Sequence, residues 1–225
     1  PLRLSYGGQV LRAKGSQLRP ERQFTQVGVE LIGVPEGSES RALIEIVDLC
    51  MTALGDAGVP DVTVDLTLPQ VARAAAQADP VLIQALNERN AALAETATAT
   101  AGEAVREVVS LISAFGPWRG AVTLMDKVKG GKAWRELENV AEAVETRHPS
   151  VEVLVDPAEL RGFDYHTGLS FVLYAKGVRG ELGRGGLYQA GEEQAAGFTL
   201  YMDSVLRAVP AQTPPEKVSV AADTD

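Results

Sequence analysis

Polar side chains that could bind a small molecule lie near the start of this 225-residue chain. Residues 22–30 read Arg-Gln-Phe-Thr-Gln-Val-Gly-Val-Glu, which places an amide at Gln26 and a carboxylate at Glu30. Both groups can accept hydrogen bonds from an ammonium group or from a ring N–H. The segment alternates as a strand does, so Gln26 and Glu30 are expected on one face of it. They either point into a binding pocket or are simply outward residues of that strand.

A second polar segment supplies a cation and aromatic rings. Residues 160–168 read Leu-Arg-Gly-Phe-Asp-Tyr-His-Thr-Gly, and the planar guanidinium of Arg161 can bind a carboxylate through two hydrogen bonds. Tyr165 and His166 follow, and Tyr188 comes later, after a Gly-Gly pair. A free amino acid needs an acceptor for its ammonium group, a cation for its carboxylate and partners for its side chain. The two segments together offer such a set, although Gln26 and Glu30 taken alone fit the outward-facing alternative better.

Other combinations of residues give no comparable signal for chemistry. Residues 183–186 are rich in glycine, but the Lys-Ser or Lys-Thr pair of a phosphate-binding loop does not follow. The sequence has no metal-ligand spacing, and no cofactor is expected. The single cysteine, Cys50, lies among apolar residues at helical spacing and is expected in the core. A lone cysteine also fits a reducing cytoplasm.

The charge and hydropathy of the chain disfavour several classes of partner. With 30 acidic and 21 basic residues the net charge is -9, which is the wrong sign for a nucleic-acid ligand. The lysines Lys127, Lys129 and Lys132 are expected in a solvated loop. No apolar run approaches the roughly 18 residues of a membrane span, and no signal segment opens the chain. We expect a soluble, cytoplasmic protein with neither a nucleic-acid nor a membrane partner.

The periodicity of the apolar residues predicts an α+β fold. An antiparallel hairpin is expected first, followed by a helix, a strand and a second helix. The predicted strands are residues 2–11, 23–32, 61–67, 151–155 and 168–174, and the predicted helices are residues 38–54 and 69–78.

The same pattern divides the chain into parts. Residues 1–79 are predicted as the first part of the core, residues 80–148 as a helical insertion, and residues 149–208 as the second part of the core. In the second part, a glycine-rich turn is expected to lead to Gly197 and a final helix. Residues 209–225 are predicted as a linker and a strand that is cut short, in a fragment of a longer protein.

The element order and several motifs resemble the catalytic core of histidyl-tRNA synthetases, which are class II aminoacyl-tRNA synthetases. Residues 22–30 are similar to the family motif Arg-Gln-Phe-His-Gln-x-Gly-x-Glu, and residues 161–168 to Arg-Gly-Leu-Asp-Tyr-Tyr-x-Gly. Residues 185–188 and 195–200 fall at the family's Gly-Gly-Arg-Tyr-Asp segment and at motif 3. The resemblance covers roughly residues 6–206, and it implies an antiparallel sheet flanked by helices, with a helical insertion.

In that register the resemblance implies a histidine pocket. Gln26 would help to hold the α-amino group, Arg161 the carboxylate and Glu30 the imidazole. Tyr188 would close the pocket over the ligand.

The chain departs from the family at the residues that handle ATP. The motif 2 arginine is kept as Arg12, but Lys14 replaces the motif's glutamate and reverses its charge. Ser204 replaces the motif 3 arginine that lies against the ATP phosphates, and Tyr201 fills a space that a glycine leaves open. Loss of a cation that neutralises developing phosphate charge commonly costs orders of magnitude in rate. In the histidine pocket, His166 stands where the family usually has a tyrosine.

A synthetase fold with a degenerate ATP site resembles the regulatory subunits of ATP phosphoribosyltransferase. The resemblance implies a noncatalytic protein that assembles with the short-form catalytic subunit, supports the first step of L-histidine biosynthesis and contributes to feedback inhibition by histidine. It also implies self-association through a segment preceding Pro1. Two alternatives stay open, a catalytic-domain fragment of a histidyl-tRNA synthetase and a paralogue that activates or carries another amino acid. Lys14 and Ser204 argue against both.

Overall fold

The computed structural model describes residues 1–11, 13, 22–97, 102–125, 131–160, 162 and 165–211, and an eight-stranded sheet runs through this part of the chain. The strands are β1 (Leu2–Leu11), β2 (Gln23–Ile32), β3 (Val62–Thr67), β4 (Gly116–Pro117), β5 (Glu152–Val155), β6 (His166–Ala175), β7 (Gly183–Ala190) and β8 (Glu193–Tyr201). Their order across the sheet is β1-β2-β8-β7-β6-β3-β5-β4. Only β3 and β5 pair in parallel, so the sheet is mainly antiparallel.

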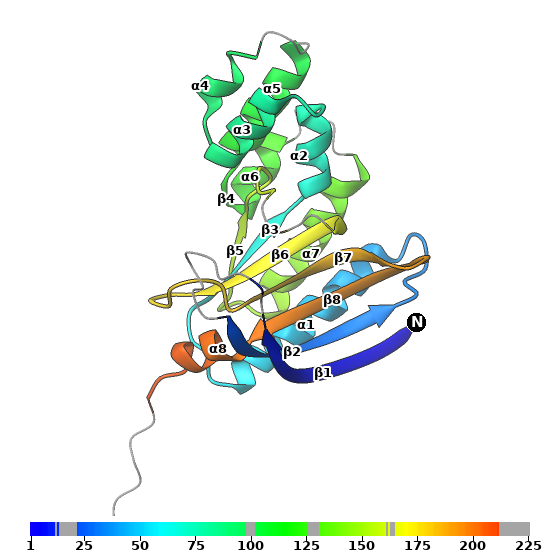
Figure 1. Ribbon diagram of the computed structural model, residues 1–225, viewed down its shortest axis with the longest axis vertical. Coiled ribbons are helices and arrows are strands. Elements are labelled where there is room, and N and C mark those ends of the chain that lie inside the picture. Colours follow the sequence, from blue (N-terminus) through cyan, green and yellow to red (C-terminus); the bar gives the residue numbers. More distant parts are fainter. Residues whose placement is uncertain are drawn as a thin grey trace, which may run out of the picture.

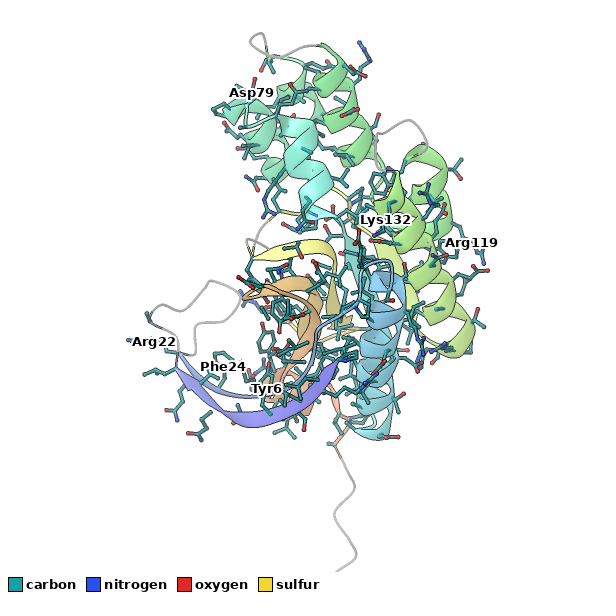
Figure 2. The ribbon with its side chains drawn as sticks, turned by 90° about the vertical axis from the view of Figure 1, so that its right-hand side faces the viewer. Tyr6, Arg22, Phe24, Asp79, Arg119 and Lys132 are labelled. Carbon is teal, nitrogen blue, oxygen red and sulfur yellow. The ribbon has the colours of Figure 1, made fainter. Side chains whose placement is uncertain are left out.

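Helices cover one face of the sheet and form a group at one end of it (Figure 1). α1 (Glu39–Asp56) contacts β7 and β8, and α7 (Lys132–Arg147) lies beside α1 and contacts β5 and β6. Figure 2 shows both helices on the same side of the sheet. The group at the end of the sheet consists of α2 (Pro69–Ala76), α3 (Pro80–Glu88), α4 (Ala91–Ala94), α5 (Gly102–Ser113) and α6 (Trp118–Met125). The short helix α8 (Met202–Ala208) packs against β2 and β8.

The apolar stripe of α1 forms part of the core. Its side chains at helical spacing, which include Leu43, Ile46, Val47 and Leu54, are at most 1% exposed. Burying one such side chain stabilises the fold by roughly 1.5–3 kcal/mol. Cys50 is fully buried in the same stripe, and burial raises the pKa of its thiol. The expectation that Cys50 is a core residue is confirmed.

Most of the expected elements are confirmed, and so is the α+β class. The first hairpin pairs along its whole length, from Leu2 with Ile32 to Leu11 with Gln23. α1 and α2, and the strands β3, β5 and β6, begin and end within about two residues of their expected bounds. α7 packs on α1 and the sheet although it lies within residues 80–148. The division of the chain into parts stays a prediction.

The expectation for the glycine-rich segment is wrong. Residues 183–201 form the hairpin of β7 and β8, and the last helix begins only at Met202. Gly197 therefore lies inside β8, where it pairs with Glu30 on one side and Gly186 on the other. A glycine-rich segment is typical of a turn or of a helix start. In β8, Gly197 is needed because the side chain of Glu30 occupies the space that a β-carbon would fill.

Several expectations fall on residues outside the described part of the chain. They concern Lys127 and Lys129 of the expected basic loop, and residues 212–225, which hold most of the expected linker and the terminal strand. Among the helices that the structure describes, none is long and apolar enough to cross a membrane.

Candidate functional site

A cavity of about 180 Å³ lies over β2, β8, β7 and the start of β6. Its lining residues are Glu30, Tyr165, His166, Arg184, Gly185, Tyr188, Gly197, Phe198 and Thr199. Successive side chains of a strand point to opposite faces of the sheet. Leu187 and Ala196 belong to the core under α1 and α7, so Tyr188 and Gly197, their neighbours in sequence, face the other side. The cavity thus lies on the face opposite the two long helices.

Two glycines, one lining this cavity and one in the neighbouring strand, make room for side chains. A β-carbon at Gly197 would lie 1.9 Å from Glu30 Oε2, so only glycine allows the carboxylate to lie across β8. A β-carbon at Gly28 would lie 2.4 Å from the ring of Tyr6, which crosses β2 and joins its hydroxyl to Thr199 Oγ1 at 2.6 Å. The glycines of the two family motifs therefore make room for Glu30 and Tyr6.

Glu30 is the carboxylate of the cavity. The hydroxyl of Tyr188 donates a hydrogen bond of 2.8 Å to Glu30 Oε2. Burial raises the pKa of Glu30, and the bond from Tyr188 partly opposes that shift. Burial and the neighbouring carboxylate also raise the pKa of Tyr188. The pair presents a partly desolvated acceptor that a bound imidazole N–H or ammonium group would satisfy.

His166 forms a buried wall of the cavity. The residue is 4% exposed, and its ring lies 4.1 Å from the ring of Tyr165, centroid to centroid. Burial lowers the pKa of His166 to about 4, with the positive charges of Arg184 and Arg73 acting in the same direction. The imidazole is therefore neutral near pH 7. The side-chain amide of Gln70 donates to the carbonyl of His166 and fixes the backbone there.

Arg184 is a cation of the cavity that the sequence did not single out. Its Nε donates to Glu181 Oε2 at 3.0 Å, and its Nη1 donates to the carbonyl of Gly162 at 2.9 Å. The guanidinium is thus held by two fixed acceptors beside Tyr165 and His166. No signal in the sequence pointed to this role, because only the folded chain brings Glu181 and the carbonyl of Gly162 to Arg184. Tyr6 and Thr199 were also missed, because no role in binding was predicted for either residue, although Thr199 falls at motif 3.

The structure brings together four of the predicted histidine-binding residues, namely Glu30, Tyr165, His166 and Tyr188. Gln26 lies on the same face of β2, opposite Tyr201 in the register, and is not part of the cavity lining. Arg161 lies outside the described residues, as do Arg12 and Lys14 of the predicted ATP site. The roles of all these residues in binding stay predictions.

The third residue of the predicted ATP site, Ser204, lies in α8. Its side chain is fully buried, and its hydroxyl lies 3.1 Å from Nη2 of Arg207. Arg207 also forms an ion pair of 3.3 Å with Asp203. Tyr201, just before the helix, is 3% exposed and packs edge-on against Phe24 at 5.7 Å between centroids. Phe24 and Tyr6 are labelled together beside the first hairpin in Figure 2.

A mainly antiparallel sheet with helices on one face and a polar cavity on the other defines a class II synthetase-like core. The family model of histidyl-tRNA synthetase matches residues 1–205, and the chain belongs to this family.

Curated relatives indicate which kind of protein within this family the chain is similar to. The chain is 45% identical, over 97% of its length, to the ATP phosphoribosyltransferase regulatory subunit of Rhodospirillum centenum, and 43% identical, over 99%, to the protein of the same name from Rhodospirillum rubrum. It spans 58% and 60% of the length of these two relatives.

Solved structures share the fold. An ATP phosphoribosyltransferase regulatory subunit/histidyl-tRNA synthetase from Bacillus halodurans superposes with a TM-score of 0.77 at 25% identity, covering 94% of this chain and 59% of that one. A chain of the ATP phosphoribosyl transferase (HisG:HisZ) complex from Thermotoga maritima superposes with a TM-score of 0.70 at 16% identity, covering 89% of this chain and 73% of that one. The expected class II synthetase-like fold is confirmed.

Proposed function

We propose that the full-length protein is a noncatalytic regulatory subunit of ATP phosphoribosyltransferase. It assembles with the short-form catalytic subunit, supports the first step of L-histidine biosynthesis and takes part in feedback inhibition by histidine. The observation that carries the proposal is the 45% identity, over 97% of the chain, to a relative with this name. The fold alone would not distinguish a regulatory subunit from a catalytic histidyl-tRNA synthetase, because both share it.

Histidine is the proposed ligand of the cavity beside Glu30. The carboxylate of Glu30 would accept a hydrogen bond from the imidazole, and Tyr188 would hold that carboxylate in place. Gln26 would bind the α-amino group and Arg161 the carboxylate, with Arg184 as a second cation on the wall. Histidine inhibits the assembly only if it binds the inactive state more tightly than the active one.

The proposed loss of adenylation rests on the residues near the family's nucleotide site. Ser204 supplies no positive charge and lies fully buried. The ring of Tyr201 occupies space beside Phe24 where the family's glycine would leave a gap. In the sequence, Lys14 takes the motif 2 position that is a glutamate in active members of the family. These features support binding of histidine without its activation by ATP.

The second candidate is the catalytic domain of a histidyl-tRNA synthetase, which the family model over residues 1–205 favours. Histidine-dependent exchange of pyrophosphate into ATP separates the two functions, because it requires adenylation. We expect the full-length protein to give no exchange above a no-enzyme control, with an active histidyl-tRNA synthetase run in parallel as the positive control. Exchange at a rate comparable with that synthetase would refute the noncatalytic proposal.

The remaining partners follow from the same proposal. Self-association would use chain that precedes Pro1 in the full-length protein, and the cytoplasm is the proposed location because the single Cys50 suits a reducing compartment. A net charge of -9 argues against a nucleic-acid partner.

A further inference from the structure

A second cavity, of about 360 Å³, lies on the helix-covered face of the sheet. The first turns of α1, α2 and α7 meet there over β6, β7 and β8. Its polar lining consists of Glu39, Gln70, Lys132, Glu136, Thr167 and Gln194. Leu68 and Leu187 are among its apolar walls. Figure 2 labels Lys132 at this junction of helices and sheet.

The two cavities lie back to back across the same strands. Thr167 and Leu187 line the second cavity, whereas His166 and Tyr188, their neighbours in sequence, line the first. Adjacent residues of a strand face opposite sides, so only the thickness of the sheet separates the two sites.

The charged groups of the second cavity carry a net negative charge. Lys132 Nζ lies 3.0 Å from Glu39 Oε1 and 3.5 Å from Glu136 Oε1, so one ammonium group serves two carboxylates. Glu136 is only 9% exposed, and burial raises the pKa of its carboxyl group. A desolvated carboxylate that shares its cation would be stabilised by a second positive charge.

Two amides connect this cavity to the first. Gln70 Nε2 donates to the carbonyl of His166, and Gln194 Nε2 donates to the carbonyl of Tyr188 at 3.2 Å and to Thr167 Oγ1 at 3.1 Å. Gln70 Oε1 is buried and accepts no hydrogen bond from any residue in the described ranges. The two amides therefore join the wall of the second cavity to the backbone of two residues that line the first.

We propose that this second cavity binds a small molecule that carries a primary ammonium group. Glu136 and Glu39 supply the counter-charge, and Leu68 and Leu187 contact the aliphatic part. An ammonium group has three donors, which suits a site with more acceptors than donors. Because Gln70 and Gln194 hold the backbone of two walls of the first cavity, the bound amine also changes the affinity of that cavity for histidine. This last step rests on the proposed function.

Binding is tested with n-butylamine and butyrate, which match in size and differ in charge, titrated into the full-length protein by calorimetry without histidine. We expect saturable binding of the amine and none of the carboxylate. Glu136→Gln should weaken amine binding by about tenfold, since it removes a charged acceptor with little change in shape. Glu142→Gln is the matched control on the exposed side of α7, and it should leave the affinity unchanged.

Ala133→Leu gives an independent test, because it fills the cavity without altering a charge. It should weaken amine binding while the circular dichroism stays that of the wild type. Equal affinities of the wild type and Glu136→Gln, or binding of butyrate as tight as that of the amine, would overturn the proposal. So would a lack of binding for n-butylamine, 1,4-diaminobutane and L-valine alike.

The link between the cavities is measured by titrating histidine with and without saturating n-butylamine. We expect the affinity for histidine to change by threefold or more and the affinity for the amine to change by the same factor, as linkage requires. An unchanged histidine affinity would refute the link. Absence of histidine binding in both titrations would instead count against the proposed function. Binding of the amine is tested separately, by the titration without histidine.

Discussion

Replacing Glu30 with glutamine is expected to lower the affinity of the full-length protein for histidine by roughly thirtyfold to a hundredfold. The substitution keeps the shape of the side chain and removes the charge that Tyr188 and the bound imidazole share. Hydrogen bonds to a charged group stabilise by about 1.5–3 kcal/mol, which corresponds to the expected loss. Isothermal titration calorimetry measures it directly.

The control for Glu30→Gln is Glu193→Gln, which makes the same change at an exposed residue at the start of β8. This variant should bind histidine as the wild type does. The free energy of unfolding of Glu30→Gln should be equal to or slightly above that of the wild type, because burial already penalises the charged carboxylate. Wild-type affinity in Glu30→Gln would remove Glu30 from the histidine site.

Acid is expected to destabilise the fold through His166 by about 2–3 kcal/mol between pH 7 and pH 4.5. Burial lowers the pKa of His166 to about 4, whereas the unfolded chain takes up this proton near the ordinary histidine pKa of 6.5. Between these two values the unfolded state binds more protons than the folded state. The free energy of unfolding therefore falls as the pH falls through this window, by about 1.4 kcal/mol for each unit of the pKa difference.

His166→Phe tests this contribution, since it keeps an aromatic ring beside Tyr165 and removes the titration. Asp65 has the opposite effect on the free energy of unfolding. Burial raises its pKa to about 7, so its contribution to stability increases as the pH falls. The wild type alone therefore does not isolate the contribution of His166. Urea denaturation at pH 7 and pH 4.5 should show that His166→Phe gains about 2–3 kcal/mol on the wild type at the lower pH. Tyr165→Phe, which keeps His166, should retain the acid sensitivity of the wild type. An equal loss of stability in His166→Phe and the wild type would contradict a buried neutral imidazole.

The sequence predicted the elements whose patterns are local. Strands β1 and β2 alternate and are separated by a polar segment, and α1 carries an uninterrupted apolar stripe, so their bounds could be read from periodicity. The hairpin of β7 and β8 could not be read in this way. Its glycines are required by side chains of other strands, as Gly197 is by Glu30, and that requirement appears only when the strands pair.

The candidate site was predicted where its residues belong to a motif. Glu30, Tyr165, His166 and Tyr188 were expected from such motifs and lie around one cavity. Arg184 was not expected, since its role depends on Glu181 and on the carbonyl of Gly162, which only the folded chain brings to it. The buried state of His166 likewise depends on packing against residues distant in sequence.

The second cavity could not be predicted from the sequence either, because its residues are distant in sequence and meet only in the folded chain. Lys132 was expected in a solvated basic loop. Its side chain is 59% exposed, but Lys132 begins α7, and its ammonium group lies between Glu136 and Glu39 of a different helix. Charge counts along the chain do not reveal such a group, because the two carboxylates come from α1 and α7.

The most direct test of the regulatory role is the steady-state rate of phosphoribosyl-ATP formation by purified short-form ATP phosphoribosyltransferase, with and without the full-length protein. We expect the full-length protein to raise this rate and histidine to reverse the increase, while Glu30→Gln raises the rate but responds to histidine only at much higher concentration. A rate that the full-length protein leaves unchanged, with or without histidine, would contradict the proposed function.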